Sequence, residues 1–455
     1  GELGHTNTED SKNGYLCPTT GVTTDLFYPA GIVFRRAAAR FIKDSRPPKD
    51  KRHPRACAPF QGVSCFHSYT IYKSTLTPPM SDTKVRIMHV CDKWGVGGSS
   101  IHGVSQALSR WIARLDSGRF ETRLIGLRGG GKAQKELERK GLNITNLGRS
   151  KFDPLALSDL LQHINSWKPT ILHLHGYASA DFGLIAGKLT ETKTIVHEHF
   201  VDPQIPFYQV ACDYILSRLS TLNIACSRAV KEFMVDRRFF REDNTRVIYY
   251  GAPLDEFEPS SSEVAREERE RWGIRQSSTV VGSVGRLDEQ KGLRYLIEAA
   301  PSILKDYPNV TFVLVGDGPL RDDLEERAVE LDVIDNFVFT GYHREPQKVR
   351  TVFDVQVFPS LWEGIPLTIV EAMAMGLPII STNVDGIKEA LQHEKNALIV
   401  DERDAQQLAE SIDRLLSNPS LADSLAKQAK SDSVDHDIAH TTHQLAETYL
   451  EVSNL

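Results

Sequence analysis

Residues 279–292 read TVVGSVGRLDEQKG, and this stretch decides the fold of the second half of the chain. An apolar, β-branched run (Thr279–Val284) leads into a glycine, an arginine, a lysine and a second glycine, Gly292. Such a strand-to-helix turn presents backbone N–H groups and a positive helix end to an anion. Arg286 and Lys291 add two cations, which can hold a diphosphate without a metal. The same pattern also fits a surface turn with solvated charges.

The alternation of strands and helices continues on both sides of this turn. Strands separated by helix-length segments indicate βαβ units, parallel sheets and ligands at the carboxyl ends of the strands. Because the alternation begins afresh after residue 270, we expect two facing doubly wound domains. Predicted strands include Val85–Val90, Thr122–Leu127, Thr170–Leu174, Thr194–His197, Leu222–Ala225, Thr279–Val284, Thr311–Val315, Asn336–Thr340, Val355–Phe358 and Pro378–Ser381. Predicted helices include Val104–Leu115, Leu293–Tyr307, Pro319–Leu331, Pro366–Met375 and Ala405–Leu416.

Domain boundaries follow from this pattern. We expect a first Rossmann-like domain over residues 80–255 and a second over 256–435, with the charged segment Ser260–Arg271 as linker and first helix. Apolar side chains at helical spacing near the C-terminus predict that residues 436–455 return to the first domain as a helix.

Composition limits the class of protein. The 455 residues carry a formal charge of −6, which argues against nucleic acid as a partner. No apolar run reaches the roughly 20 residues that a membrane-spanning helix needs. Six cysteines are too few for a disulfide scaffold, so a reducing, cytoplasmic location is expected.

Residues 1–79 differ from the rest and are predicted to be an extension that is disordered or not part of the native enzyme; a genuine extra module is the alternative. The first methionine is Met80, directly before a strand-like run, and it fits the start of a compact enzyme. The basic run Arg35–Arg55 suits a solvated tail, or an anionic membrane surface. A set of histidines and cysteines has the spacing H-x3-C-x7-C-x-H, which matches no usual zinc pattern. These residues are His53, Cys57, Cys65 and His67.

Two glutamates eight positions apart lie in Phe358–Met373, which reads FPSLWEGIPLTIVEAM. A strand ends near Phe358 and a helix is expected from Pro366, so Glu363 lies on a loop at the carboxyl edge of the sheet. Glu371 lies on the helix, where its carboxylate can accept two hydrogen bonds from a ribose diol. Capping and surface glutamates are the alternative. The backbone around Gly364, Ile365 and Leu367 would face a phosphate or sugar hydroxyl.

Two pairs of histidines end neighbouring strands in the first half: His173 with His175, and His197 with His199. Alternation along a strand puts the members of each pair on one face. Zinc binding is disfavoured, because H-E-H lacks the helical H-E-x-x-H spacing and a third ligand. Core histidines are the alternative to a role in catalysis.

Glycine-rich turns follow two further strands. The segment Trp94–Ser100 (WGVGGSS) lacks the G-x-G-x-x-G spacing of a nicotinamide-binding loop. Residues 316–319 (GDGP) form a second such turn, where glycine permits close approach of backbone to a ligand. Either segment also fits a plain structural turn.

Together these motifs resemble the group-one (family-four) retaining glycosyltransferases of the GT-B fold. The resemblance rests on Gly285-Arg286…Lys291-Gly292, Gly316-Asp317-Gly318-Pro319, Phe339-Thr340-Gly341 and Glu363…Glu371 in this order, and it covers roughly residues 84–450. It implies a metal-independent transfer of a sugar from a UDP- or GDP-sugar to a hydroxyl acceptor, with the anomeric configuration retained. The leaving phosphate would help to deprotonate the acceptor from the front side.

The resemblance also assigns roles to residues. Catalytic positions would be His199, Glu363, Arg286 and Lys291, with Glu371 on the ribose and Glu363 on the transferred sugar. Donor contacts would come from Gly97, Gly98, Gly316, Gly341, Tyr342, Gly364, Ile365, Pro366 and Leu367. Contacts to the sugar acceptor would come from His175 and Arg228.

Other functions remain open from the sequence. One is a catalytically silent nucleotide-sugar-binding subunit that supports a partner enzyme. Another is a different GT-B activity, such as a sugar-nucleotide epimerase or a glycan phosphorylase. The basic helix around Trp111 fits docking at the inner face of a membrane, as in related enzymes, or a solvated surface. The acceptor, the linkage and the oligomeric state cannot be read from the sequence.

Overall fold

The computed structural model of the protein describes residues 84–96, 100, 101, 103–257 and 261–455. The expectations for residues 1–83, including the basic run and the histidine–cysteine set, lie outside the described residues. The same holds for Gly97 and Gly98.

The first half of the described chain forms a parallel sheet with the strand order β5-β4-β1-β6-β7-β8-β9. Its strands are rich in β-branched residues, and the inner strands β6, β7 and β8 are buried on both faces, as expected for a parallel sheet between helices. The strand bounds are β1 Val85–Cys91, β4 Phe120–Gly126, β5 Ile144–Asn146, β6 Ile171–His175, β7 Lys193–Glu198, β8 Leu222–Ala225 and β9 Thr245–Val247. The predicted strands are confirmed here to within two residues at each end.

The second half forms another parallel sheet, with the order β12-β11-β10-β13-β14-β15. This order reverses between β10 and β13, and ligands of such sheets bind beside this switch point, outside the carboxyl ends of the strands. The bounds are β10 Thr279–Val284, β11 Val310–Val315, β12 Phe337–Gly341, β13 Val355–Phe358, β14 Ile379–Thr382 and β15 Leu398–Val400. The predicted bounds of β10 and β13 coincide with those observed.

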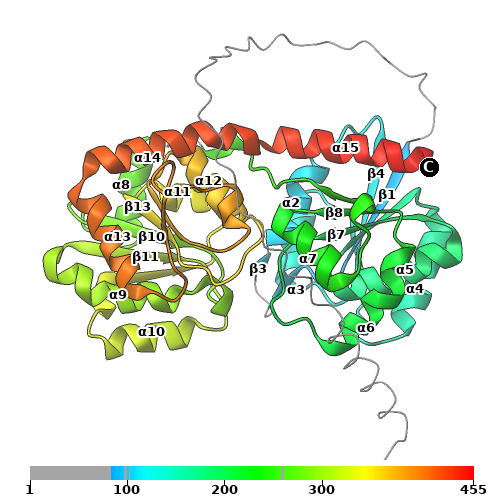
Figure 1. Cartoon of the computed structure of the whole chain (residues 1–455), viewed down its shortest axis with the longest axis horizontal. Coiled ribbons are helices and arrows are strands. Elements are labelled where there is room, and N and C mark those ends of the chain that lie inside the picture. The colour runs from blue at the N-terminus through cyan, green and yellow to red at the C-terminus, as the bar shows by residue number, and fades with distance from the viewer. Residues whose placement is uncertain (1–83, 97–99, 102, 258–260) are drawn as a thin grey trace, which may run out of the picture. The chain divides into compact units, whose positions relative to one another are not determined.

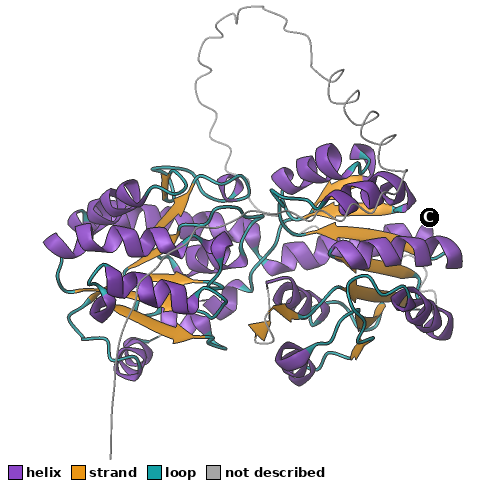
Figure 2. Ribbon diagram, turned by 90° about the horizontal axis from the view of Figure 1, so that it is seen from below, coloured by secondary structure: helices purple, strands orange, loops and turns teal. Residues whose placement is uncertain are grey.

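Helices flank both sheets, as Figure 2 shows. In the first half these are α2 Gly103–Ile112, α3 Gly131–Arg139, α4 Leu155–Trp167, α5 Tyr177–Thr190, α6 Phe207–Leu216 and α7 Arg228–Arg238. In the second half they are α8 Ser262–Arg271, α9 Leu293–Asp306, α10 Arg321–Glu330, α11 Pro346–Arg350, α12 Leu367–Met375, α13 Ala405–Ser417 and α14 Pro419–Asp432.

The last helix, α15 (Ile438–Asn454), runs back to the first sheet (Figure 1). It contacts α2, β1 and β6, and its buried side chains Leu445, Tyr449 and Val452 belong to the core of the first half. The predicted return of the C-terminal helix is therefore confirmed. Among the described residues, no helix combines the length and the apolar character needed to cross a membrane.

The glycine-rich turn after β1 departs from a simple loop. Two short antiparallel strands, β2 (Gly95–Val96) and β3 (Ser100–Ile101), pair across it before α2 begins. The glycine at the start of the second turn is explained by the close approach of Gly316 to Gly285. Gly316 has φ +144°, and a Cβ there would lie 1.8 Å from the carbonyl oxygen of Gly285. Only glycine fits this contact between the ends of β10 and β11.

Candidate active site

Glu363 lies on the loop after β13, beside the switch point of the second sheet, and it is buried. Lys291 donates a hydrogen bond to its Oε1 atom and forms an ion pair with it. Gln290 Nε2 donates to Oε2 over 3.1 Å, and Ser360 Oγ donates to Oε1 over 3.0 Å. Lys291 and Glu363, which the sequence suggested separately, are therefore neighbours, because the loops after β10 and β13 meet.

Arg286 lies on the loop after β10, at the same carboxyl edge of the second sheet as Glu363. Its guanidinium forms an ion pair with Asp288, and its side chain is 38% exposed. Lys291 is 20% exposed. Both cations are thus held in place by carboxylates while remaining open to solvent on one side, which suits groups that receive an anionic ligand.

Glu371 is buried on α12 between two arginines. Arg110 Nη1, from α2, lies 2.9 Å from its Oε1 atom, and Arg350 Nη2, from α11, lies 2.8 Å from its Oε2 atom. The ring of Phe257 lies 5.5 Å from Arg110 and 5.8 Å from Arg350. The sequence predicted the glutamate, but neither arginine, because their contacts depend on how α2 and α11 pack.

The Gly364 loop packs against the carboxyl end of β7. A Cβ at Gly364 would lie 2.6 Å from the carbonyl oxygen of His199 and 2.9 Å from Sγ of Cys226. Cys226 Sγ donates to the same carbonyl oxygen over 3.1 Å, and burial raises the pKa of this thiol to about 12. The amide of Ile365 donates to Cys226. Pro366 precedes the first residue of α12, Leu367.

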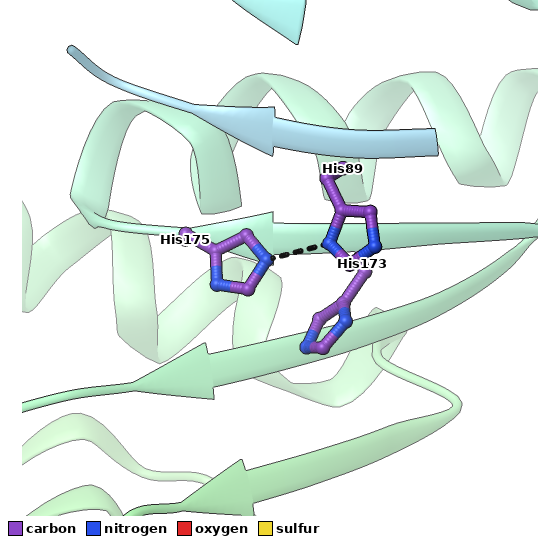
Figure 3. A group of neighbouring side chains, drawn as sticks. All are labelled: His89, His173 and His175. Carbon is purple, nitrogen blue, oxygen red and sulfur yellow. Dashed lines mark hydrogen bonds between the residues drawn. The ribbon is translucent and has the colours of Figure 1, made fainter. Parts of the chain in front are cut away.

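Five buried histidines form a layer at the carboxyl ends of β1, β6 and β7: His89, His173, His175, His197 and His199. Register explains the layer, because His89 pairs with His173 across β1 and β6, and His175 pairs with His197 across β6 and β7. Figure 3 shows three of the rings converging from their strands. We call this set the histidine layer.

Both ring nitrogens of His199 are engaged within the histidine layer. Its Nε2 lies 3.0 Å from Nδ1 of His175, and its Nδ1 contacts the hydroxyl of Tyr250. The side chains of His199 and His175 are buried, as the alternative of core histidines predicted. His89 was not predicted as a site residue. It lies two residues before Cys91, the last residue of β1, and so near the carboxyl end of its strand, as the other histidines do.

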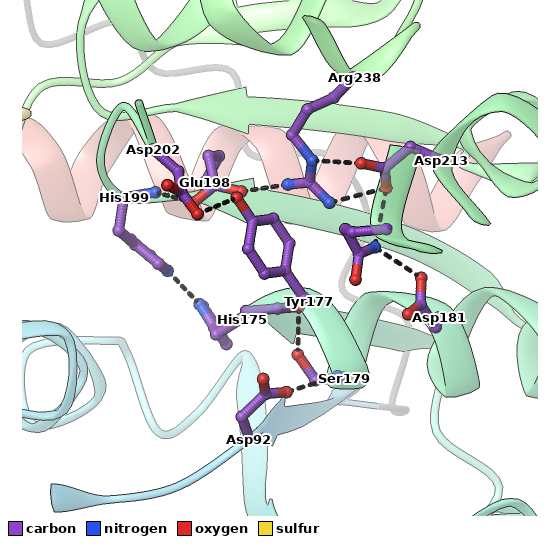
Figure 4. A network of polar contacts seen from close by, with 12 residues as sticks. Asp92, His175, Tyr177, Ser179, Asp181, Glu198, His199, Asp202, Asp213 and Arg238 are labelled. Carbon is purple, nitrogen blue, oxygen red and sulfur yellow. Dashed lines mark hydrogen bonds and ion pairs between the residues drawn. The ribbon is translucent and has the colours of Figure 1, made fainter. Parts of the chain in front are cut away.

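Glu198, between the two predicted histidines, points to the opposite side of β7 and binds Arg238 of α7. Arg238 is buried and also pairs with Asp213 over 2.8 Å (Figure 4). The amide of His199 donates to Glu198 Oε1 over 3.0 Å. This carboxylate therefore anchors the end of β7, and the H-E-H sequence separates into a histidine face and a structural ion pair.

The remaining predicted positions lie at loop ends. Gly341 ends β12 with φ +70°, and its neighbour Tyr342 donates to Glu136 over 2.9 Å. Arg228 begins α7, and its amide donates to Glu389 Oε2 over 3.0 Å. Gln290 and Ser360 were not predicted as partners of Glu363, although both lie inside the sequence motifs described above.

Comparison with protein families agrees with this arrangement. The family "Glycosyl transferases group 1" matches residues 264–432, and "Glycosyltransferase Family 4" matches residues 101–256. An uncharacterised glycosyltransferase of Methanocaldococcus jannaschii is 30% identical over 308 residues, which cover 66% of this chain and 74% of the relative. The UDP-Gal:alpha-D-GlcNAc-diphosphoundecaprenol alpha-1,3-galactosyltransferase of Escherichia coli is 27% identical over 58% of this chain and 70% of its own length.

Solved structures share the fold. HepE of Anabaena, solved in complex with UDP, superposes with a TM-score of 0.70 at 21% identity, over 80% of this chain and 100% of its own. Sucrose-phosphate synthase of Thermosynechococcus elongatus gives a TM-score of 0.65 at 19% identity, over 81% of this chain and 99% of its own. The chain has two Rossmann-like domains, and in each of them the loops at the switch point of the sheet contact each other. These domains, the matched families and these relatives show that the chain belongs to the group 1, family 4 glycosyltransferases, retaining enzymes of the GT-B fold that use nucleotide sugars.

Proposed function

We propose that the protein transfers a sugar from a UDP-sugar to a hydroxyl acceptor and that its donor site lies at the switch point of the second sheet. The carrying observation is the ion pair of Lys291 with Glu363, beside Arg286, at the carboxyl ends of β10 and β13. The choice of UDP is supported by HepE, solved with UDP-glucose, and by the UDP-Gal-dependent relative.

In this proposal Arg286 and Lys291 hold the donor diphosphate and stabilise the charge that develops on it as the sugar leaves. Fixed cations act this way because they are oriented before the reaction begins. The amino end of α9, at Leu293, adds a partial positive charge next to Lys291. The transfer then needs no metal, so activity is expected to persist in a chelator.

Glu363 orients the transferred sugar, and Gln290 and Ser360 fix the direction of its carboxylate. Glu371 binds the ribose diol. Although each of its oxygens already faces an arginine, a carboxylate offers about four lone-pair directions. Two of these remain for hydroxyl donors.

The acceptor is proposed to lie on the side of the first sheet, near the histidine layer and the start of α7. His199 is proposed to contact a donor hydroxyl, which requires exchange of one of its two hydrogen bonds within the layer. His175 and Arg228 are proposed to contact the sugar acceptor. We also propose that the two domains comprise residues 80–255 and 256–435. The enzyme is further proposed to be cytoplasmic and to dock on a membrane.

The test is incubation of the full chain with a panel of UDP- and GDP-sugars, with release of the nucleoside diphosphate as the readout. We expect release with at least one UDP-sugar and its loss in Glu363→Ala and Lys291→Ala, with unchanged circular dichroism. Tight donor binding without release or transfer would instead identify a silent binding subunit.

A further inference from the structure

Two chains of hydrogen bonds run through the histidine layer. The first starts at the hydroxyl of Tyr250, which contacts Nδ1 of His199. His199 Nε2 lies 3.0 Å from His175 Nδ1 (Figure 4), and His175 Nε2 lies 3.1 Å from His89 Nδ1 (Figure 3). In each step an Nε2 atom faces the Nδ1 atom of the next ring.

The second chain has the same construction. The hydroxyl of Tyr449, on α15, lies 2.7 Å from Nδ1 of His173, and His173 Nε2 lies 3.2 Å from His197 Nδ1. Each chain therefore begins at a buried tyrosine hydroxyl. Within the described part of the protein, each also ends on an Nε2 atom without a hydrogen-bond partner, at His89 and at His197.

Burial disfavours the charged form of the imidazole rings in these chains. Burial lowers the pKa of His89 to about 3, and lowers the pKa values of His173 and His197 well below the ordinary value. A neutral imidazole has one N–H and one lone pair. Each contact between two rings needs one N–H and one lone pair, so the tautomer of one ring fixes the tautomers of the others. Each chain therefore has two possible arrangements of its protons, which we call proton orders.

The tyrosine hydroxyl decides between these two orders. Tyr250 is 5% exposed, and among the described residues its hydroxyl contacts one acceptor, His199 Nδ1. If Tyr250 donates, one group in the chain stays unpartnered, the N–H at His89 Nε2. If His199 donates instead, both the tyrosine proton and the His89 lone pair are stranded. Because the second order leaves one more buried polar group without a partner, and each such group costs its desolvation, the first order is favoured.

We propose that Tyr250 orders the first chain, so that His199, His175 and His89 all carry their protons on Nε2. Tyr250 and His175 are then positioning residues for His199, and this consequence for donor binding rests on the proposed function. His199 would present a donor at Nε2 and an acceptor at Nδ1, with no choice of tautomer left to the ring.

The same order excludes a metal. Two overlapping triads in the histidine layer, around His175, bring their ring nitrogens within 4.8 Å of one another, as a metal site would require. With Tyr449 donating to His173 as Tyr250 donates to His199, every Nδ1 lone pair along both chains accepts a hydrogen bond, and every Nε2 atom is protonated. No lone pair is left to bind an ion.

The experiment is long-range 1H–15N NMR of the full chain labelled with 15N-histidine, which distinguishes the two tautomers. His199→Gln identifies the His199 signals by their disappearance. We expect an Nε2–H tautomer for His199 in the wild type. In Tyr250→Phe both proton orders strand the same number of groups, so a mixture of tautomers is expected at His199.

Tyr449→Phe is the matched control, because Tyr449 is also a buried tyrosine but belongs to the second chain. This variant should leave the His199 signals unchanged. An Nδ1–H tautomer of wild-type His199, or wild-type signals in Tyr250→Phe, would overturn the proposal. So would a shift of these signals on addition of Zn²⁺. The spectra need no donor, so they test the proton order even if the panel of UDP-sugars gives no turnover.

Discussion

Arg110 Nη1 lies 2.9 Å from Glu371 Oε1, although the two residues are 261 positions apart and belong to helices α2 and α12. Their side chains are 11% and 2% exposed. Arg350, fully buried, approaches the other oxygen of the same carboxylate. The glutamate proposed to bind the ribose is therefore also the counter-ion of two arginines.

This arrangement predicts that Glu371→Gln lowers stability as well as donor affinity. Removing the charge leaves Arg350 without a buried counter-ion, which typically costs about 3–5 kcal/mol. Urea unfolding measures this loss. Glu256→Gln is the control, since Glu256 pairs over 3.0 Å with Arg114, in the turn that follows α2, at a more exposed position. It should cost no more than about 1 kcal/mol. Equal losses in both variants would contradict a buried charge cluster.

Gln290 is predicted to act through Glu363. In Gln290→Ala the carboxylate loses the donor to its Oε2 atom, and its orientation becomes less defined. We expect kcat for donor turnover to fall about tenfold, the equivalent of about 1.4 kcal/mol. Gln406→Ala, which removes an exposed contact to Glu410 on α13, should leave kcat unchanged. A fall in both variants, or in neither, argues against this role.

Gly364 is predicted to tolerate no side chain. Its Cβ would press on the carbonyl oxygen of His199 and on Cys226, so Gly364→Ala should displace the loop that carries Glu363. Overpacking of this kind costs about 1–3 kcal/mol, measurable as a lower melting temperature with loss of turnover. In Gly103→Ala, on α2, the new Cβ would meet no other part of the described structure within 4 Å beyond its chain neighbours and its own helix backbone, so this variant should not be destabilised. Normal turnover in Gly364→Ala would show that the loop is not held as described.

Acid is predicted to weaken the fold through the histidine layer. Burial lowers the pKa of His89 from 6.5 to about 3, so below pH 6.5 the unfolded chain takes up a proton that the native state refuses. Stability is complete above pH 6.5 and falls as the pH drops toward 3, by up to about 1.4 kcal/mol per pH unit.

Urea unfolding at pH 7.5, 6.5 and 5.5 tests this prediction. Asp181 acts in the opposite direction, because burial raises its pKa from 3.8 to about 6, so it adds stability as the pH falls through this range. The comparison of wild type with His89→Asn isolates the histidine. The variant should lose less stability between pH 6.5 and 5.5, and a steeper loss would refute the assignment.

The fold could largely be predicted from the sequence because its signals are local. The runs Thr279–Val284 and Val355–Phe358 are β-branched and bounded by glycine or proline, and both strands were placed correctly. Short edge strands such as β5 and β15 were not singled out, since three residues give too little periodicity.

The site was predictable where its residues follow strands that are neighbours in the sheet. Lys291 and Glu363 follow strands that lie at the switch point, so their meeting could be expected from topology. Arg110 and Arg350 could not, because their contacts with Glu371 arise from the packing of helices distant in sequence. The ring partners of His199 depend on strand register, which the sequence does not show directly.

Calorimetric titration of UDP into the wild type, Arg286→Gln, Lys291→Met and Arg294→Gln tests the central claim most directly. Arg294, 66% exposed on α9, is a matched cation outside the site. We predict that each of the first two variants weakens UDP binding at least about tenfold, the loss of about 1.4 kcal/mol that one charge-assisted contact supplies, while Arg294→Gln binds as the wild type does. Equal affinity in all four proteins would contradict the account.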